Sequence, residues 1–320
     1  MEDKFKISRI MKAAKAISIL SIITAHLRDS ENIVSERLGS IGVIVFIFIA
    51  GYYFHPKKYN TLRSFFQKKA TTIIIPWVFT GSILYIIENQ FSLPGLFNWL
   101  IGNGSYLYYL TILMLCYLVL FYLRSRVVLI ALIFINILSQ VLTAFGIIDH
   151  CAFVLFGMGP VNNYLNLFNW IGYFALGVMA KEIPLDSLFY RLKQMIWIIL
   201  PGYVLLLAGS LLLEPDKGGY FSKLAIPMQL AGVLTVFAFA SVRCLHRRWV
   251  YRLSDLTFAI YLTHFFVFPI RRFLPTGVPG EVLNPFLILI IVSGLLYLGQ
   301  RISRLLSLEK LYTLMLGIRG

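Results

Sequence analysis

The chain has 320 residues, of which 59% are hydrophobic and only 13% are charged, and its mean hydropathy is +0.80. Soluble domains are about 45–50% apolar and about 25% charged, so this chain has too few charged residues to cover a water-facing surface. This excludes an ordinary soluble enzyme, a disordered protein and a nucleic-acid-binding module, although the net charge of +15 would suit the last of these. The composition predicts an integral membrane protein whose basic residues gather on the cytoplasmic side.

Ten apolar segments are candidates for membrane-spanning helices, because a helix needs about 20 mostly apolar residues to cross a bilayer. They cover residues 10–27, 38–54, 71–88, 105–123, 127–145, 168–181, 195–213, 224–242, 254–271 and 284–302. Runs such as Val127–Leu138 are apolar on every side, which favours helices over the alternating strands of a membrane barrel. The first segment is not followed by a small-residue cleavage site, so we interpret it as a retained helix rather than a signal peptide.

The distribution of basic residues predicts the orientation of these segments. With both termini in the cytoplasm, 23 of the 29 Lys and Arg residues fall in inside segments and six in outside segments. The predicted outer loops 89–104 and 146–167 contain no Lys or Arg. One span more or fewer would destroy this alternation. We therefore predict one all-α transmembrane domain over residues 1–320, with about ten transmembrane helices and cytoplasmic N- and C-termini.

The loops are too short to hold a soluble catalytic domain, so any chemistry must lie among the helices or at their ends. The three cysteines, Cys116, Cys151 and Cys244, are scattered and form neither a disulfide framework nor a metal-binding pattern. We expect no metal site. Ionisable residues within membrane spans are costly there, and they are the first candidates for function.

The first span carries such residues on one face. Lys15 and His26 are eleven positions apart, which is three helical turns plus about 20°, and about 16 Å along the axis. Lys12 lies within about 40° of the same line. A phosphate-bearing molecule from the cytoplasm could bind the lysines and extend toward the imidazole. Alternatively, Lys15 extends to the inner interface and His26 only marks the outer one, and the spacing alone does not choose.

Two further spans contain informative residues. Tyr261 and His264 in the ninth span are three positions apart and share a helix face. They either line a polar cavity or form a hydrogen-bonded pair in the interior. In the second span, the small residues Ala50-Gly51 predict the close approach of another backbone, and packing is sufficient to explain them.

Five blocks of sequence follow one another along nearly the whole chain. They are Lys15 with His26 after ten intervening residues, Gly42–Phe54, Lys68-Lys69 with Ile75-Pro76-Trp77, Trp170–Gly177 and Ile260–His264. In order and spacing they resemble the motifs of the membrane acyltransferase 3 family, of the stand-alone type that modifies glycans. There are two departures. Lys15 stands where arginine is more usual, and Thr71-Thr72-Ile73 occupies a stretch where many members have a second arginine. Since arginine offers a bidentate fork and lysine a point charge, phosphate-binding geometry differs with that choice.

The resemblance implies an O-acetyltransferase of the bacterial cytoplasmic (inner) membrane. Its donor would be cytoplasmic acetyl-CoA or another acyl-CoA. Its acceptor would be a hydroxyl of an extracytoplasmic carbohydrate, free or lipid-linked, such as O-antigen or exopolysaccharide. The donor's phosphates would lie on Lys12, Lys15, Lys68 and Lys69. His26 would be the catalytic residue, either as a general base or as a transient carrier of the acyl group, since an imidazole with an ordinary pKa near 6.5 suits both roles.

The acceptor-side candidates are Tyr261, His264, Asn163 and Trp170. The last two lie in the outer segment 157–170, which is rich in glycine, asparagine and aromatic residues that suit sugars. A plain turn with interfacial aromatic residues explains that segment equally well. A polytopic transporter or flippase of a lipid-linked sugar explains the ten spans but not the ordered motifs. A regulatory membrane protein with a degenerate site is a third reading.

Overall fold

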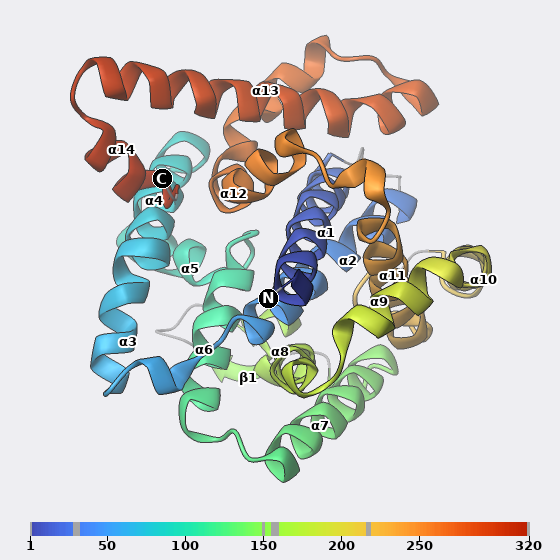
Figure 1. Cartoon of the computed structure of the whole chain (residues 1–320). Helices are drawn as coiled ribbons and strands as arrows, with labels where there is room; N and C mark the ends of the chain where they lie inside the picture. The colour runs from blue at the N-terminus through green and yellow to red at the C-terminus, as the bar shows by residue number, and fades with distance from the viewer. Residues whose placement is uncertain (1, 28–32, 149–150, 155–159, 216–218, 319–320) are drawn as a thin grey trace. The chain divides into compact units, whose positions relative to one another are not determined.

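The computed structural model describes residues 2–27, 33–148, 151–154, 160–215 and 219–318 (Figure 1). Within these ranges the protein is built from helices, with one pair of short strands. The chain divides into two compact units, one formed by residues 1–49 and 179–293 and the other by 50–178 and 294–320. The prediction of a single transmembrane domain thus remains a prediction, and each unit is interleaved with the other along the sequence.

The first unit is organised around its N-terminal helix. Its elements are α1 (Glu2–His26), most of α2 (Ile33–Tyr52), η5 (Ala180–Glu182), α9 (Leu185–Gln194), α10 (Ile196–Leu213), α11 (Ala225–Ala240), η6 (Arg243–Leu245), α12 (Arg248–Thr263), η7 (His264–Phe273) and the first part of α13 (Gly277–Leu305). Helix α1 packs against α12, α11 and α9 (Figure 1). Its buried face contains small residues such as Ala13 and Ala14, which are fully buried and let neighbouring helices approach closely.

Glycines of α2 bring that helix into backbone contact with α1. A Cβ atom at Gly42 would lie 2.5 Å from the carbonyl oxygen of Ser18, and one at Gly39 would overlap Ala25. No side chain larger than hydrogen fits at either position without a shift of the backbone. This contact fixes the C-terminal half of α1, the half that ends at His26.

The helical path changes where α12 ends. Helix α12 stops at Thr263, and the chain continues as the 3₁₀ helix η7. Pro269 within η7 has no backbone N–H and its ring clashes with the carbonyl four residues earlier, so an α-helix is disfavoured through this segment. His264 therefore lies at a junction between two kinds of helix.

Arg37 lies just before the predicted span 38–54. The structure places it inside α2, which begins at Ile33, with its side chain fully buried. Its guanidinium donates a hydrogen bond to the backbone carbonyl of Glu214, and the Glu214 carboxylate accepts one from the backbone N–H of Lys223 at 2.5 Å. A buried guanidinium is tolerated only with such partners. The helix therefore begins five residues before the predicted span, because hydropathy does not indicate that an arginine is buried with a backbone carbonyl as its partner.

The second unit contains the remaining elements. They are η1 (Pro56–Lys58), α3 (Leu62–Lys69), the π-helical turn η2 (Ala70–Ile74), α4 (Ile75–Glu88), α5 (Leu93–Ile101), α6 (Tyr108–Tyr122), α7 (Arg126–Ala144), β1 (Cys151–Val154), β2 (Pro160–Val161), η3 (Asn163–Leu165), η4 (Leu167–Asn169), α8 (Ile171–Met179) and α14 (Glu309–Leu316). Strands β1 and β2 pair antiparallel. Segments α3, η2 and α4 follow one another as one long helix, with α14 packed against α4 (Figure 1). The π turn precedes Pro76, whose missing N–H and bulky ring disturb the regular hydrogen-bond ladder.

An aromatic cluster forms part of the core of the second unit. The ring of Phe54 lies 5.7 Å from that of Phe65, 5.4 Å from Tyr117 and 5.5 Å from Phe174, measured between centroids. A Cβ atom at Gly51 would overlap the carbonyl oxygen of Phe174. The close backbone approach predicted at Ala50-Gly51 is thus confirmed, and packing is its reason.

Every one of the ten predicted spans coincides with helical structure, but fewer helices qualify as spans by themselves. Among the described residues, six helices are long and apolar enough to cross a membrane: Val34–Tyr52, Leu62–Glu88, Arg126–Ala144, Ile196–Leu213, Arg248–Phe273 and Pro279–Leu305. Shorter apolar helices occur at Tyr108–Tyr122 and Ala225–Ala240. Helix α1 carries too many charges to qualify, and α8 has only nine residues. The count of ten and the cytoplasmic termini remain predictions.

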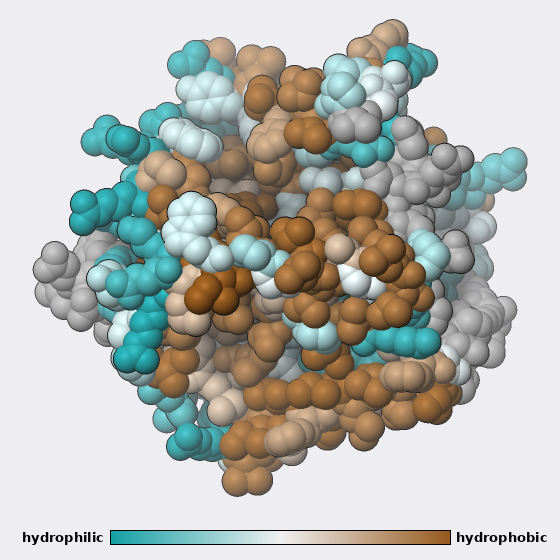
Figure 2. Space-filling model, turned by 90° about the vertical axis from the view of Figure 1, so that its right-hand side faces the viewer, coloured by the Kyte–Doolittle hydropathy of each residue, from teal (hydrophilic) through white to brown (hydrophobic). Residues whose placement is uncertain are grey.

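The surface agrees with a lipid environment. Hydrophobic residues, coloured brown, cover much of the face in Figure 2. On α10, the side chains of Trp197 and Leu212 are each 83% exposed, and Val127 on α7 is 78% exposed. Monomeric soluble proteins rarely expose apolar surface on this scale. The all-α fold and this surface are those of an integral membrane protein, as the composition predicted.

Candidate functional site

The two histidines of the first and last motifs meet within the first unit. His26 is the last residue of α1 and is half-buried, and His264 is the first residue of η7 and is fully buried. Their ring centroids lie 5.4 Å apart, with an angle of 38° between the planes. The sequence predicted His26 as the catalytic residue and His264 as a residue on the acceptor side. It did not predict that they touch, because no pattern along the chain links the two segments.

The backbone holds the His264 ring in one tautomer. Its Nδ1 lies 2.8 Å from the carbonyl oxygen of Tyr261 and 3.2 Å from that of Ile260. A nitrogen facing two carbonyl oxygens must carry the proton, so Nδ1 is the donor and a neutral ring keeps its lone pair on Nε2. The carbonyl groups of the last turn of an α-helix lack the full set of intrahelical partners, although that of Ile260 also accepts the backbone N–H of His264.

Aromatic rings surround the histidine pair. Phe265 lies 5.1 Å from the His26 ring and 4.6 Å from the His264 ring, and Phe268 lies 5.4 Å from His264, between centroids. Tyr261 is buried and its ring is 6.2 Å from that of His264, which agrees with the predicted shared face. The pair therefore sits in a largely apolar environment, where electrostatic interactions and hydrogen bonds are stronger than in water.

Near the middle of α1, the structure pairs one of the two predicted phosphate-binding lysines of this helix. Lys12 Nζ lies 3.0 Å from a carboxylate oxygen of Asp255 on α12 and 5.9 Å from the centre of the Tyr251 ring. The Lys12 and Asp255 side chains are 35% and 47% exposed, so solvent screens the pair. Lys15 is half-buried one turn further along. Because α1 is helical throughout, Lys15 and His26 do share the predicted face.

The other two predicted phosphate-binding lysines belong to the second unit. Lys68 and Lys69 end α3. The ammonium group of Lys69 lies 4.2 Å from the centre of the Tyr117 ring and 5.3 Å from that of Phe65, a cation–π arrangement. The hydroxyl of Thr72 donates to the carbonyl of Lys68 at 3.0 Å. Aromatic contacts thus hold at least one of the two charges in place.

The structure gives Asn163 and Trp170 packing roles. Trp170 is fully buried, and its indole N–H donates to the carbonyl of Tyr164 at 2.9 Å. The amide of Asn163 donates to the carbonyl of Ile148 at 2.9 Å. The buried indole exposes no ring face in this structure, and the acceptor-side role of Trp170 and Asn163 stays a prediction. Residues 157–159 of the predicted sugar-binding segment lie outside the described residues.

Within the described part of the chain, no three His, Cys, Asp or Glu side chains gather as metal ligands would. Comparisons with curated proteins and with solved structures return no match. A family model described as an acyltransferase domain matches residues 10–299 and so includes the Lys15–His26 motif, both lysines of α3 and the His264 segment. The chain therefore belongs to the acyltransferase 3 family.

Proposed function

We propose that this membrane acyltransferase moves an acetyl or other acyl group from cytoplasmic acyl-CoA to a hydroxyl of an extracytoplasmic cell-surface glycan, in the bacterial inner membrane. The observation that carries the proposal is the contact of His26 with His264 in a chain of this family. The contact supports a reactive imidazole held by a second, tautomerically defined imidazole.

In one route His26 is a general base. A ring nitrogen takes the proton of the acceptor hydroxyl while its oxygen attacks the thioester carbonyl of acyl-CoA. The tetrahedral intermediate then collapses, the carbon–sulfur bond breaks, and the leaving sulfur of CoA takes the proton from the imidazolium. General base catalysis of this kind is worth about 10²–10⁴-fold in rate.

In the other route His26 carries the acyl group. The unprotonated ring nitrogen attacks the thioester carbonyl, the carbon–sulfur bond breaks, and the CoA sulfur takes the proton of the other ring nitrogen, which leaves a neutral acyl-imidazole on the enzyme. The acceptor hydroxyl then attacks that carbonyl, the carbon–nitrogen bond breaks, and the ring nitrogen regains a proton from the hydroxyl. This route separates in time the donor step from the acceptor step. It suits a donor and an acceptor that approach from opposite sides of the membrane.

His264 acts in both routes as a positioning residue for His26. Its Nδ1–H is engaged with the Tyr261 carbonyl, and a neutral ring therefore presents Nε2 as an acceptor. Ring centroids 5.4 Å apart bring two imidazoles within reach of an N–H···N hydrogen bond. Such a bond would orient His26 and stabilise the positive charge that forms when His26 takes a proton.

The lysines supply the donor side of the proposal. We expect Lys15 to bind phosphate groups of acyl-CoA, because it lies on the His26 face of α1 near the end predicted to be cytoplasmic. Lys68 and Lys69 are further candidates. Lys12 contributes less, because Asp255 already balances its charge.

The test is transfer of radiolabelled acetyl groups from acetyl-CoA by purified protein in nanodiscs. The acceptor is the surface glycan of the host cells, stripped of its esters with mild base. The wild type should label the glycan, and His26→Ala should reduce labelling at least about 100-fold. The matched control is His55→Gln, which alters an exposed histidine of the second unit and should leave the rate unchanged.

A transporter or flippase of a lipid-linked sugar predicts a different result. Such a protein would move a lipid-linked sugar across vesicle membranes without acetyl-CoA and would label no glycan. A regulatory protein would do neither. Mass spectrometry of His26 after a single turnover without acceptor separates the two enzymatic routes, since only the carrier route leaves an acetyl group on the ring.

A further inference from the structure

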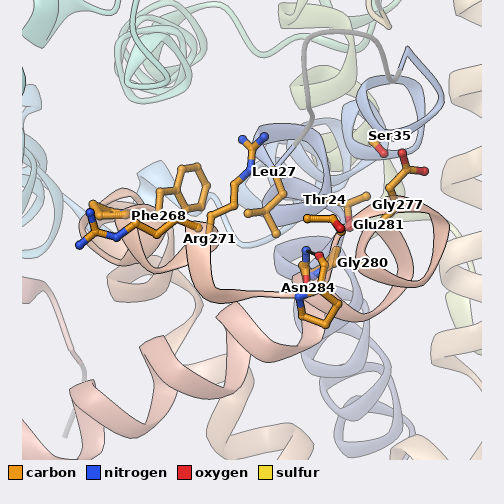
Figure 3. Close-up of a pocket in the computed structure, with 14 residues that line it drawn as sticks. Thr24, Leu27, Ser35, Phe268, Arg271, Gly277, Gly280, Glu281 and Asn284 are labelled. Carbon is orange, nitrogen blue, oxygen red and sulfur yellow. Dashed lines mark hydrogen bonds between the residues drawn. The ribbon is translucent and has the colours of Figure 1, made fainter.

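A pocket opens beside the histidine pair, wholly within the first unit. It has a volume of about 410 Å³, at the lower end of the roughly 300–1,000 Å³ typical of small-molecule sites. Its walls come from the end of α1, the start of α2, η7 and the start of α13. Figure 3 shows Phe268 and Arg271 on one side of it, with Thr24, Glu281 and Asn284 on the other. It thus lies at the His26 end of α1, away from Lys12 and Lys15.

Phe268 lines the pocket and packs against the rings of His264 and Phe265, both of which contact His26. Its ring lines the pocket and lies 4.6 Å from the ring of Phe265, which in turn lies 5.1 Å from His26. Thr24 and Leu27, on either side of His26 in the sequence, also line it. A molecule held here is therefore close to His26 without lying against it.

One buried polar atom of the pocket lacks a partner. The side-chain amide of Asn284 donates to the carbonyl of Pro275 at 3.0 Å, which fixes how the amide is turned. Its oxygen, Oδ1, is buried and accepts no hydrogen bond from any residue that the structure describes. A buried acceptor left in this state costs free energy unless a ligand or water donates to it. Because this oxygen has almost no accessible surface, it lies behind the pocket wall, and the charged and apolar side chains of the lining decide which ligand fits.

The charges in the pocket further restrict the ligand. Glu281 lies three residues before Asn284 on α13, so the two acceptors share a helix face. Arg271 and Arg272 supply donors from η7. Glu281 repels a simple anion and the arginines repel a simple cation. A polyol can form hydrogen bonds with both the Glu281 carboxylate and the arginines, because each hydroxyl both donates and accepts.

We infer that this pocket binds a sugar residue of the glycan acceptor, one that is not itself acylated, while a neighbouring sugar reaches His26. The inference rests on the proposed function. The lining supports this inference, since Phe268 offers an apolar face to a sugar ring and His26 is not among the residues that line the pocket, so the reacting sugar would lie outside it. The pocket would then position the glycan so that the hydroxyl of the neighbouring sugar lies at His26.

The kinetic test uses full-length protein in nanodiscs, acetyl-CoA and the base-treated host glycan. Glu281→Gln removes the carboxylate charge and Asn284→Leu removes the side-chain amide, and each should raise the apparent KM for the glycan about two- to tenfold. The KM for acetyl-CoA should stay within about twofold. Glu182→Gln is the matched control, because Glu182 is an exposed carboxylate outside the pocket, and it should change neither constant.

A second measurement does not depend on activity. Thr276 is exposed and lines the pocket. In a Cys244→Ser background, which removes an exposed thiol, Thr276→Cys should react with a maleimide more slowly when the base-treated glycan is present. Glu281→Gln should weaken that protection.

The outcomes distinguish the two proposals. If the wild type transfers no acetyl group but the glycan still protects Thr276→Cys, the proposed function fails and the sugar site stands. If transfer occurs but the pocket variants leave the glycan KM unchanged, or raise the KM for acetyl-CoA instead, the inference is wrong. Protection by acetyl-CoA and not by glycan would likewise overturn it, by assigning the pocket to the donor.

Discussion

Replacement of His264 by phenylalanine tests whether this buried ring acts through His26. Phenylalanine keeps an aromatic ring among Phe265 and Phe268 but removes both nitrogens, and with them the donor to the carbonyl of Tyr261 at 2.8 Å. If Nε2 of His264 accepts a hydrogen bond from a positively charged His26, the variant loses a bond to a charged group. Such bonds are worth about 1.5–3 kcal/mol. At about 1.36 kcal/mol per tenfold change in rate, kcat should fall about 10- to 150-fold.

The assay is a double-mutant cycle on acetyl transfer to base-treated glycan. It compares the wild type, His26→Gln, His264→Phe and the double variant, with each protein checked for a single folded species by gel filtration and thermal unfolding. The two substitutions should be strongly non-additive, with the double variant no slower than His26→Gln. The KM for acetyl-CoA should remain within about twofold in His264→Phe, because the ring lies far from the lysine end of α1.

Three results would refute this reasoning. Full activity in His264→Phe would show that the pair in the structure has no catalytic role. Additive losses in the cycle, with the double variant much slower than His26→Gln, would show that His264 acts elsewhere, for example on the acceptor directly. A lower yield of folded protein together with unchanged kcat would assign His264 to packing alone.

Three further predictions concern packing and charge. Gly51→Leu should lower the midpoint of thermal unfolding and cost about 1–3 kcal/mol, because its Cβ would overlap a backbone carbonyl of α8. Gly294→Leu should leave the midpoint unchanged, because that position faces open space. Equal effects of the two substitutions would contradict the packing argument. Arg37→Met should destabilise the protein by about 1–3 kcal/mol in the same assay, because the buried carbonyl of Glu214 loses the guanidinium that donates to it. An unchanged unfolding midpoint would show that this hydrogen bond contributes nothing to stability. Lys12→Ala should change the KM for acetyl-CoA less than about threefold, and Asp255→Asn should lower that KM modestly, because a half-exposed ion pair is worth only about 0.2–1 kcal/mol. A large rise in this KM for Lys12→Ala would show that Lys12 is a main contact of the acyl-CoA donor.

The fold class followed from composition and hydropathy. A chain with this excess of apolar residues cannot fold as a soluble domain. Its long apolar runs form helices, because the bilayer core offers no hydrogen-bond partner for unpaired backbone groups. Helix periodicity also placed Lys15 and His26 on one face of α1, and the structure agrees because α1 is continuous over both positions. The motif order indicated the acyltransferase 3 family, which the family match confirmed. All of these depend on residues that are near one another in the sequence or on totals over the chain.

The tertiary contacts of these residues could not be predicted from the sequence. Periodicity indicates which face of a helix carries His26, but not which other helix faces it, so the contact with His264 emerged only from the packing of α1 against α12 and η7. The same holds for Lys12, which shares its stripe with Lys15 but pairs with Asp255, and for Arg37, whose buried partner is a backbone carbonyl. Trp170 looked like a sugar platform by type, yet close packing around it leaves no face open. A sequence thus determines the helices and the chemistry they carry, whereas the choice of partner depends on how helix surfaces fit together, which is settled only when every helix is packed at once.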